Sequence, residues 1–120
     1  MPVLVALLVF FASGPQAEAS SLVASYGPID GAPGLRFENV EYGWDVIAFD
    51  MVNMTDSNAF VGGMMVFVDR FGLMTARVLL PHRKVPAGQP TRFIGSFMDG
   101  TGESARRAER IIWNVRVERW

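Results

Sequence analysis

The chain has 120 residues, half of them hydrophobic, with no cysteine and a formal net charge of −1. This length and composition indicate one globular domain with a modest core and exclude a disordered chain. The absence of cysteine excludes disulfides, thiolate metal sites and thiol nucleophiles, so packing alone must hold the domain together. A net charge near zero is a poor match to nucleic-acid binding.

The first 19 residues have the pattern of a secretory signal. Pro2–Ala12 is almost wholly apolar, and Ser13-Gly14-Pro15 ends the run. Ala17 and Ala19 place small residues at the −3 and −1 positions of a signal-peptidase site, and a run of about ten residues is too short to span a bilayer. No lysine or arginine precedes the run, so a retained anchor and a buried N-terminal strand stay open. We expect cleavage after Ala19, a periplasmic or extracellular location and no stable membrane insertion afterwards.

The remainder of the chain predicts strands. Residues 20–34 form a lead-in rich in glycine and proline. Apolar alternation and short apolar runs then predict strands over six segments: Leu35–Tyr42, Trp44–Met54, Phe60–Val68, Leu73–Leu80, Thr91–Met98 and Arg110–Trp120. Three prolines predict a loop over Pro81–Pro90. Residues 103–109 predict one or two helical turns, capped by Thr101 or Gly102.

The patterns within these segments predict how the strands are buried and joined. Residues 44–54 are apolar on both faces, as in a central strand covered on both sides. Asp69–Gly72 predicts a hairpin turn with Gly72 in the left-handed conformation. Asn53-Met54-Thr55 fits a glycosylation sequon, but it begins a run of turn formers, so we interpret it as turn chemistry. The last strand alternates most regularly, with these residues facing inward: Ile111, Trp113, Val115 and Val117.

These elements predict an all-β fold. Strands at short spacing with turns between them indicate an antiparallel β-sandwich of about six to seven strands, with one short helical turn before the last strand. A parallel α/β fold is excluded because no crossover helix fits between the strands. We expect the sandwich to span residues 35–120.

Five features in order carry a family resemblance: Met51-Val52-Asn53, Val66-Phe67-Val68-Asp69, Gly72, Pro86-Ala87-Gly88 and Phe93. Over about half of the chain, this order resembles the FxLYD-type and related immunoglobulin-like domains of exported bacterial proteins. The resemblance implies an immunoglobulin-like fold and a non-catalytic accessory or binding role. It supplies no catalytic residues.

Few residues offer catalytic chemistry. His82 is the only histidine, so a Ser–His–acid triad would require it, and we expect it to be neutral and exposed in a loop. Asp50 and Asp69 are the only carboxylates worth weighing for glycoside hydrolysis. Asp69 is better explained by the turn, and we expect Asp50 to pair with an arginine of the last strand or to lie at an edge. We therefore predict no catalytic residue and no enzyme activity.

Two kinds of small ligand stay open as an alternative function. Thioether and imidazole groups bind copper, and Met54, Met98 and His82 are the only candidate ligands away from the expected core. Exposed tryptophans stack on sugars; Trp44 and Trp120 are candidates, whereas Trp113 falls on the inward face. The main expectation is that methionine fills core gaps and that the protein has no cofactor and no resident metal.

Charge points to a protein partner. Residues 20–69 carry seven acids and one base, and residues 70–120 carry ten bases and four acids. Either the two halves pair their charges across interleaved strands, or the asymmetry docks on a second protein. The partner-binding candidates are Arg106, Arg107, Arg110 and Trp120, with a solvated helical turn as the alternative for the arginines. We expect an exported binding or accessory module whose partner, another protein or a second copy, meets a sheet edge or a charged face.

Overall fold

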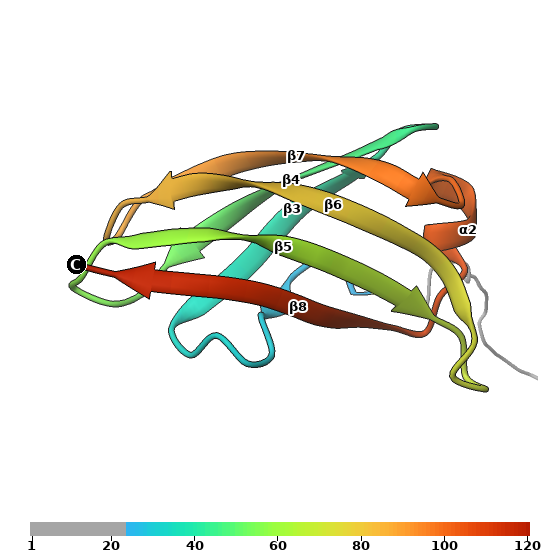
Figure 1. The fold of residues 1–120 in the computed structure, drawn as a ribbon, viewed down its shortest axis with the longest axis horizontal. Coiled ribbons are helices and arrows are strands. Elements are labelled where there is room, and N and C mark those ends of the chain that lie inside the picture. Colours follow the sequence, from blue (N-terminus) through green and yellow to red (C-terminus); the bar gives the residue numbers. More distant parts are fainter. Residues whose placement is uncertain (1–23) are drawn as a thin grey trace, which may run out of the picture.

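The computed structural model describes residues 24–120, which form one curled antiparallel sheet and one short helix (Figure 1). The elements in chain order are β2 (Gly27–Pro28), β3 (Leu35–Tyr42), β4 (Val46–Asn53), β5 (Ala59–Val68), β6 (Met74–Val85), β7 (Pro90–Asp99), α2 (Gly102–Arg106) and β8 (Arg110–Arg119). The strand order across the sheet is β2-β3-β4-β7-β6-β5-β8. The predicted all-β class, the antiparallel pairing and the helix before the last strand are confirmed. Within residues 24–120, no helix is long and apolar enough to cross a membrane.

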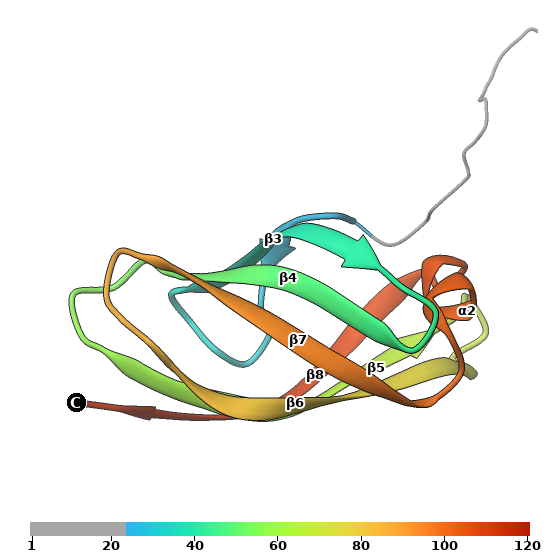
Figure 2. The ribbon, with the colours of Figure 1, turned by 90° about the horizontal axis from the view of Figure 1, so that it is seen from above.

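The sheet curls so that its two halves face each other (Figure 2). β7 follows β4 through seven residue pairs but meets β6 only around Arg77–Leu79. Across the interior, the ring centroids of Phe37 on β3 and Trp113 on β8 are 5.2 Å apart, and those of Phe49 and Trp113 are 5.8 Å apart. The packing is therefore two-layered as in a sandwich, but the expectation of two separate sheets is not confirmed because all seven strands belong to one sheet.

The inner face of this sheet is the core. β4 buries alternate residues, Ile47, Phe49 and Met51, and β8 buries Trp113 most fully, as the alternation predicts. The outer face of β4 differs from the expectation, because Val46 is exposed and Ala48 and Val52 are only partly buried. No element of the described chain lies over that face, so its apolar residues meet solvent.

The predicted loop over Pro81–Pro90 is wrong for its first half. β6 continues to Val85, because Pro81 lies at an irregularity of the ladder. Val61 pairs with Arg83 and Gly63 with Leu80, so Gly62 alone lies opposite Pro81 and His82. The pairing of β6 with β7 ends at Leu79, so β7 does not need the N–H that Pro81 lacks.

The lead-in is more ordered than its composition suggests. Gly27 and Pro28 pair with β3, and the side chains of Ile29 and Ala32 join the core. The Arg119 guanidinium donates a 2.9 Å hydrogen bond to the Pro33 carbonyl, which ties the lead-in to the end of β8. The packed part therefore begins before residue 35. The predicted signal, residues 1–19, lies outside the described residues.

Two predicted local motifs are confirmed. The Asp69 carboxylate accepts hydrogen bonds from the N–H groups of Phe71 and Leu73, and Gly72 has φ +82°. Thr101 is the N-cap of α2; its hydroxyl accepts from the Ser104 N–H, and the Ser104 hydroxyl accepts from the Thr101 N–H. Both motifs are local, which explains why short stretches of sequence predict them.

Candidate functional site

The residues weighed for catalysis do not come together. His82 lies exposed on β6 and stacks on Phe60, with ring centroids 5.5 Å apart. Asp50 pairs with Arg92 at 3.3 Å and accepts a 2.9 Å hydrogen bond from Asn39. The expected partner on the last strand is therefore wrong, because Arg92 belongs to β7, the strand next to β4. Among residues 24–120, no group of three or more histidine, aspartate or glutamate side chains is placed to hold a metal ion.

The copper candidates are far apart. β4 and β7 run antiparallel, with Val46 facing Ser96 and Val52 facing Pro90. Met98 therefore continues past one end of β4 and Met54 past the other, roughly 30 Å apart along the strand direction at about 3.3 Å per residue. Ligands of one ion must lie within about 2.5 Å of it. The fold does not bring Met54, Met98 and His82 to one point.

The exposed tryptophans do not form one platform. Trp44 is 74 % exposed beside α2, where its carbonyl accepts a hydrogen bond from the Gly102 N–H. Trp120 is 58 % exposed at the C-terminus, which lies at the opposite end of the molecule from α2 (Figure 1). Its ring centroid is 5.9 Å from the Lys84 ammonium. Trp113 lies in the core, as predicted.

The predicted arginine cluster divides among three environments. The Arg106 guanidinium lies 5.5 Å from the centroid of the Tyr42 ring. Arg107 pairs with Glu103 one helical turn away, at 2.7 Å. Arg110 is exposed at the start of β8. These three side chains therefore do not act as one patch.

The opposite charges of the two halves of the chain meet in part across neighbouring strands. Arg92 on β7 lies 2.9 Å from Glu41 and 3.3 Å from Asp50. The other ion pairs in residues 24–120 join Arg77 to Asp99 and Arg107 to Glu103, within the basic half. Pairing across interleaved strands thus explains part of the charge asymmetry, and most arginines of the second half are left for solvent or a partner.

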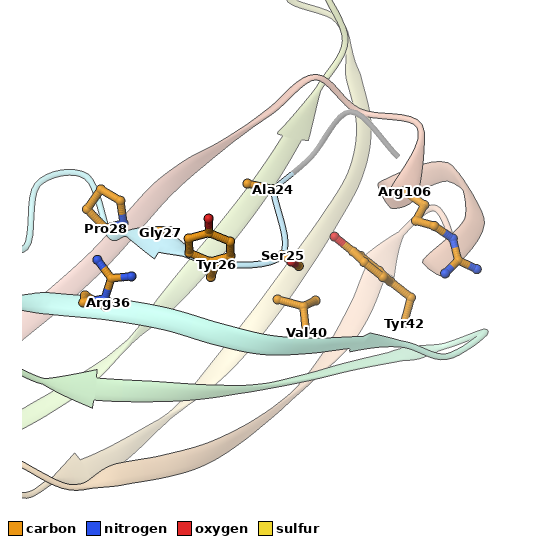
Figure 3. A pocket seen from close by; sticks show the side chains of 9 residues that line it. All are labelled: Ala24, Ser25, Tyr26, Gly27, Pro28, Arg36, Val40, Tyr42 and Arg106. Carbon is orange, nitrogen blue, oxygen red and sulfur yellow. The ribbon is translucent and has the colours of Figure 1, made fainter. Parts of the chain in front are cut away.

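An open cleft of about 720 Å³ lies between residues 24–28, β3 and α2 (Figure 3). Tyr26 and Arg36 lie at one end, and Tyr42 and Arg106 lie at the other. Neither arginine has an ion-pair partner within the described chain. The cleft presents cations and phenols but no nucleophile beside a base, so its chemistry favours binding over catalysis.

The Tyr42 hydroxyl is the unusual group in this cleft. It is enclosed, and within residues 24–120 it has no hydrogen-bond partner. Burial raises the pKa of Tyr42 to about 12, and the nearby positive charge of Arg106 opposes part of that rise. The phenol is therefore neutral at physiological pH.

We expect Tyr42→Phe to leave stability unchanged or to raise it by about 1 kcal/mol at pH 7, because it removes a buried hydroxyl without a partner. In the wild type, the folded pKa lies above the unfolded value of 10.0, so the folded state keeps its proton longer. Stability should then fall as pH rises from about 10 to 12, and the variant should lack this part of the fall. Urea unfolding at pH 7 and pH 11 measures both effects. A clear loss of stability at pH 7 would mean that the hydroxyl has a partner.

A further candidate contact surface is the unpaired edge of the sheet, which β8 forms. β8 pairs with β5 through all ten of its residues, and it is the last strand in the order. Trp120 and Asn58 exchange both of their backbone hydrogen bonds, so the even-numbered residues of β8 direct their N–H and C=O groups to β5. The odd-numbered residues direct theirs away from β5: Ile111, Trp113, Val115, Val117 and Arg119. No other strand of the described chain pairs with them.

The opposite edge is shorter and irregular. β2 pairs only with Arg36 and Phe37, so Glu38–Tyr42 of β3 have no strand partner on that side in the described chain, and the register shifts within this stretch. β8 is therefore the longest unpaired edge, and its first residues line a hollow of about 280 Å³ with Tyr26–Pro28. The sequence predicts contact at a sheet edge but not which strand forms that edge, because the position of a strand in the chain does not fix its place in the sheet.

No protein-family model, curated protein or solved structure matches the chain. The resemblance to FxLYD-type domains thus stays an expectation from sequence.

Proposed function

We propose that this protein is a non-enzymatic, exported binding module that acts in the periplasm or outside the cell by adding a strand of a partner protein to the open edge of β8. The observation that carries this proposal is the ten-residue strand paired on one side only. An exposed strand edge presents a row of backbone donors and acceptors that an extended segment satisfies. The predicted signal supports the location.

The charge of β8 indicates the kind of segment that binds. On its outer face the charged side chains are Arg110 and Arg116, against one acid, Glu118, whereas the Arg119 guanidinium already donates to Thr55 and Pro33. An acidic extended segment would gain cross-strand charge pairs at this edge, each contributing about 0.2–1 kcal/mol. Backbone bonds would supply much of the affinity, and the arginines would supply the preference for acidic partners.

A synthetic peptide series tests the proposal. Ten-residue peptides of alternating valine and threonine, with two glutamates, two lysines or no charge at the outward positions, serve as probes in fluorescence anisotropy. We expect the glutamate peptide to bind most tightly and its affinity to fall as salt is raised. The lysine peptide should bind most weakly, because its outward lysines face Arg110 and Arg116.

A variant and a control locate the binding. Val115→Pro removes an N–H that points out of the sheet, and proline is tolerated at such edge positions, so the fold should persist while peptide binding is lost. Arg36→Glu removes a positive charge from β3, near the other edge in the strand order, where Arg36 has no ion-pair partner in residues 24–120, and should leave binding unchanged. Equal binding by the wild type and a folded Val115→Pro variant would refute strand addition at β8. Circular dichroism and the urea midpoint report whether the variant is folded.

A further inference from the structure

The residues of β8 are complementary to their own reversed order. When a strand pairs with a second copy of itself in antiparallel fashion, the pairing is symmetric about one residue or one peptide. Residues at equal distances on either side of that centre then lie opposite each other. When Asn114 lies opposite Asn114 of the second copy, Arg110 lies opposite Glu118 of that copy. Symmetry repeats the contact, so this register forms two Arg–Glu pairs.

The direction of the backbone groups is compatible with this register. It places odd residues opposite odd residues, Trp113 against Val115 and Ile111 against Val117, and these are the residues whose N–H and C=O groups point out of the sheet. Arg110 and Glu118 fall at the pairs without hydrogen bonds, where opposite side chains are closest. In both copies, Arg110 and Glu118 lie on the outer, exposed face of the sheet.

Neighbouring registers are less favourable. Centring on Trp113 places Arg110 opposite Arg116 of the second copy, and centring on Arg116 places that arginine opposite itself. Like charges directly opposite each other destabilise a sheet. Centring on Val115 places Glu118 opposite Ile112 and forms no charge pair. Of the four registers near the middle of β8, only the one centred on Asn114 forms attractive pairs without repulsive ones.

The inner face also favours a second copy. Ile111, Val115 and Val117 pack against the core but are only partly buried, because no strand of the described chain pairs beyond β8; Ile111 faces a hollow of about 280 Å³ that residues 24–28 also line. In the Asn114 register they meet one another and Trp113 across the edge. Apolar side chains that the edge leaves half-covered would thus gain contacts.

We infer that the partner of the β8 edge is a second copy of this chain, joined through antiparallel β8–β8 pairing centred on Asn114 to give one continuous sheet across a two-fold axis. The inference rests on the proposed function and names its partner. It predicts a symmetric dimer whose register is set by the Arg110–Glu118 pairs. The dimer occupies the edge, so an extended acidic partner would compete with it.

Charge reversal and its rescue test the register in the purified chain by sedimentation equilibrium. Arg110→Glu converts both pairs to Glu–Glu contacts, and Glu118→Arg converts both to Arg–Arg contacts, so each should weaken the dimer about tenfold or more. The double variant Arg110→Glu/Glu118→Arg should dimerise as the wild type does. Mixing the two single variants should give mixed dimers, because each charge then faces its opposite.

A matched control lies on the same strand. Arg116 faces Ile112 of the second copy in the Asn114 register, so Arg116→Glu should leave the dimer at wild-type strength or slightly stronger. All substituted side chains are exposed and have no ion-pair partner in residues 24–120, so each variant should keep the wild-type urea midpoint as a monomer.

Three outcomes overturn the inference. The first is a wild-type chain that stays monomeric at millimolar concentration; if that monomer still binds the glutamate peptide through β8, the proposed function stands without the dimer. The second is a dimer that persists unweakened in both single variants, which would place the interface elsewhere or in another register. The third is a dimer that survives Val115→Pro in a folded protein, which would place the dimer interface away from the β8 edge; if the same variant loses binding of the glutamate peptide, the proposed function still stands.

Discussion

Replacing Asn53 with alanine is expected to lower the free energy of unfolding by about 3 kcal/mol. Asn53 at the end of β4 is the one fully buried polar side chain in residues 24–120. Its amide nitrogen donates to the carbonyls of Ser57 and Val85 at 2.8 and 3.1 Å. Its amide oxygen accepts from the N–H and hydroxyl of Thr55 at 3.1 and 2.7 Å. Alanine would leave the Val85 carbonyl buried without this donor.

Urea unfolding of Asn53→Ala and of a control, Gln89→Ala, measures this effect. Gln89 is an exposed amide between β6 and β7 without a side-chain hydrogen bond in the described residues, so its removal should change stability by less than about 0.5 kcal/mol. Equal effects of the two substitutions would contradict the role given to the buried amide. These hydrogen bonds favour the interpretation of Asn53-Met54-Thr55 as turn residues, because the amide nitrogen of Asn53 is buried and already donates two hydrogen bonds.

Gly63→Ala is expected to cost about 3 kcal/mol or more and to loosen β8 specifically. Gly63 lies on β5 with φ +144°, a conformation that residues with a side chain rarely adopt. An added Cβ atom would fall against the Asn114 carbonyl oxygen and lie 2.8 Å from the Val115 Cα, both backbone atoms of β8. β8 would have to move away from β5, which would disturb the strand that carries the proposed interface.

Gly72→Ala is the matched control for backbone strain. Gly72 has φ +82° in the β5–β6 turn, and an added Cβ atom there meets nothing within 4 Å. It should cost only the strain, about 1–2 kcal/mol. Amide hydrogen exchange separates the two variants, because Gly63→Ala should increase the exchange of Ile112, Asn114 and Arg116, whose N–H groups face β5. Unchanged protection at those three amides would refute the close approach of β5 and β8.

Hydrogen bonds at one end of the molecule connect buried Asn53 to β8, the strand that carries the proposed interface. Arg119, the last residue of β8, donates to the Thr55 hydroxyl at 2.9 Å and to the Pro33 carbonyl. Thr55 in turn donates to Asn53. The lead-in, the β4–β5 turn and the end of β8 therefore form one hydrogen-bonded corner. That corner holds β8 in place while its outer edge stays open.

Strand positions and turns were largely predictable from the sequence. Alternation along residues 110–119 placed Trp113 inside and Ile112 outside, because a strand turns successive side chains to opposite faces. Asp69, Gly72 and Thr101 could be assigned because their hydrogen bonds close within a few residues. The proline loop was misjudged, because whether Pro81 interrupts a ladder depends on which strand lies beside it.

The candidate site was less predictable. Arg110 and Trp120 were identified as surface residues, and sheet edges as contact surfaces, but the arginines were expected to act together. In the structure, Arg106 turns to Tyr42, Arg107 to Glu103 and Arg110 to the open edge. The enclosed Tyr42 hydroxyl was not predictable, because its surroundings depend on α2 and the lead-in packing beside β3.

The sequence by itself determined the all-β class, most of the strand segments and the inward face of the last strand, because those follow from local periodicity and turn chemistry. Only the tertiary structure decided that the strands form one curled sheet, that Arg92 neutralises Glu41 and Asp50, and that β8 lies at the open edge. Strand order depends on contacts between residues far apart in the chain, such as Phe37 with Trp113, and these leave no local pattern in the sequence.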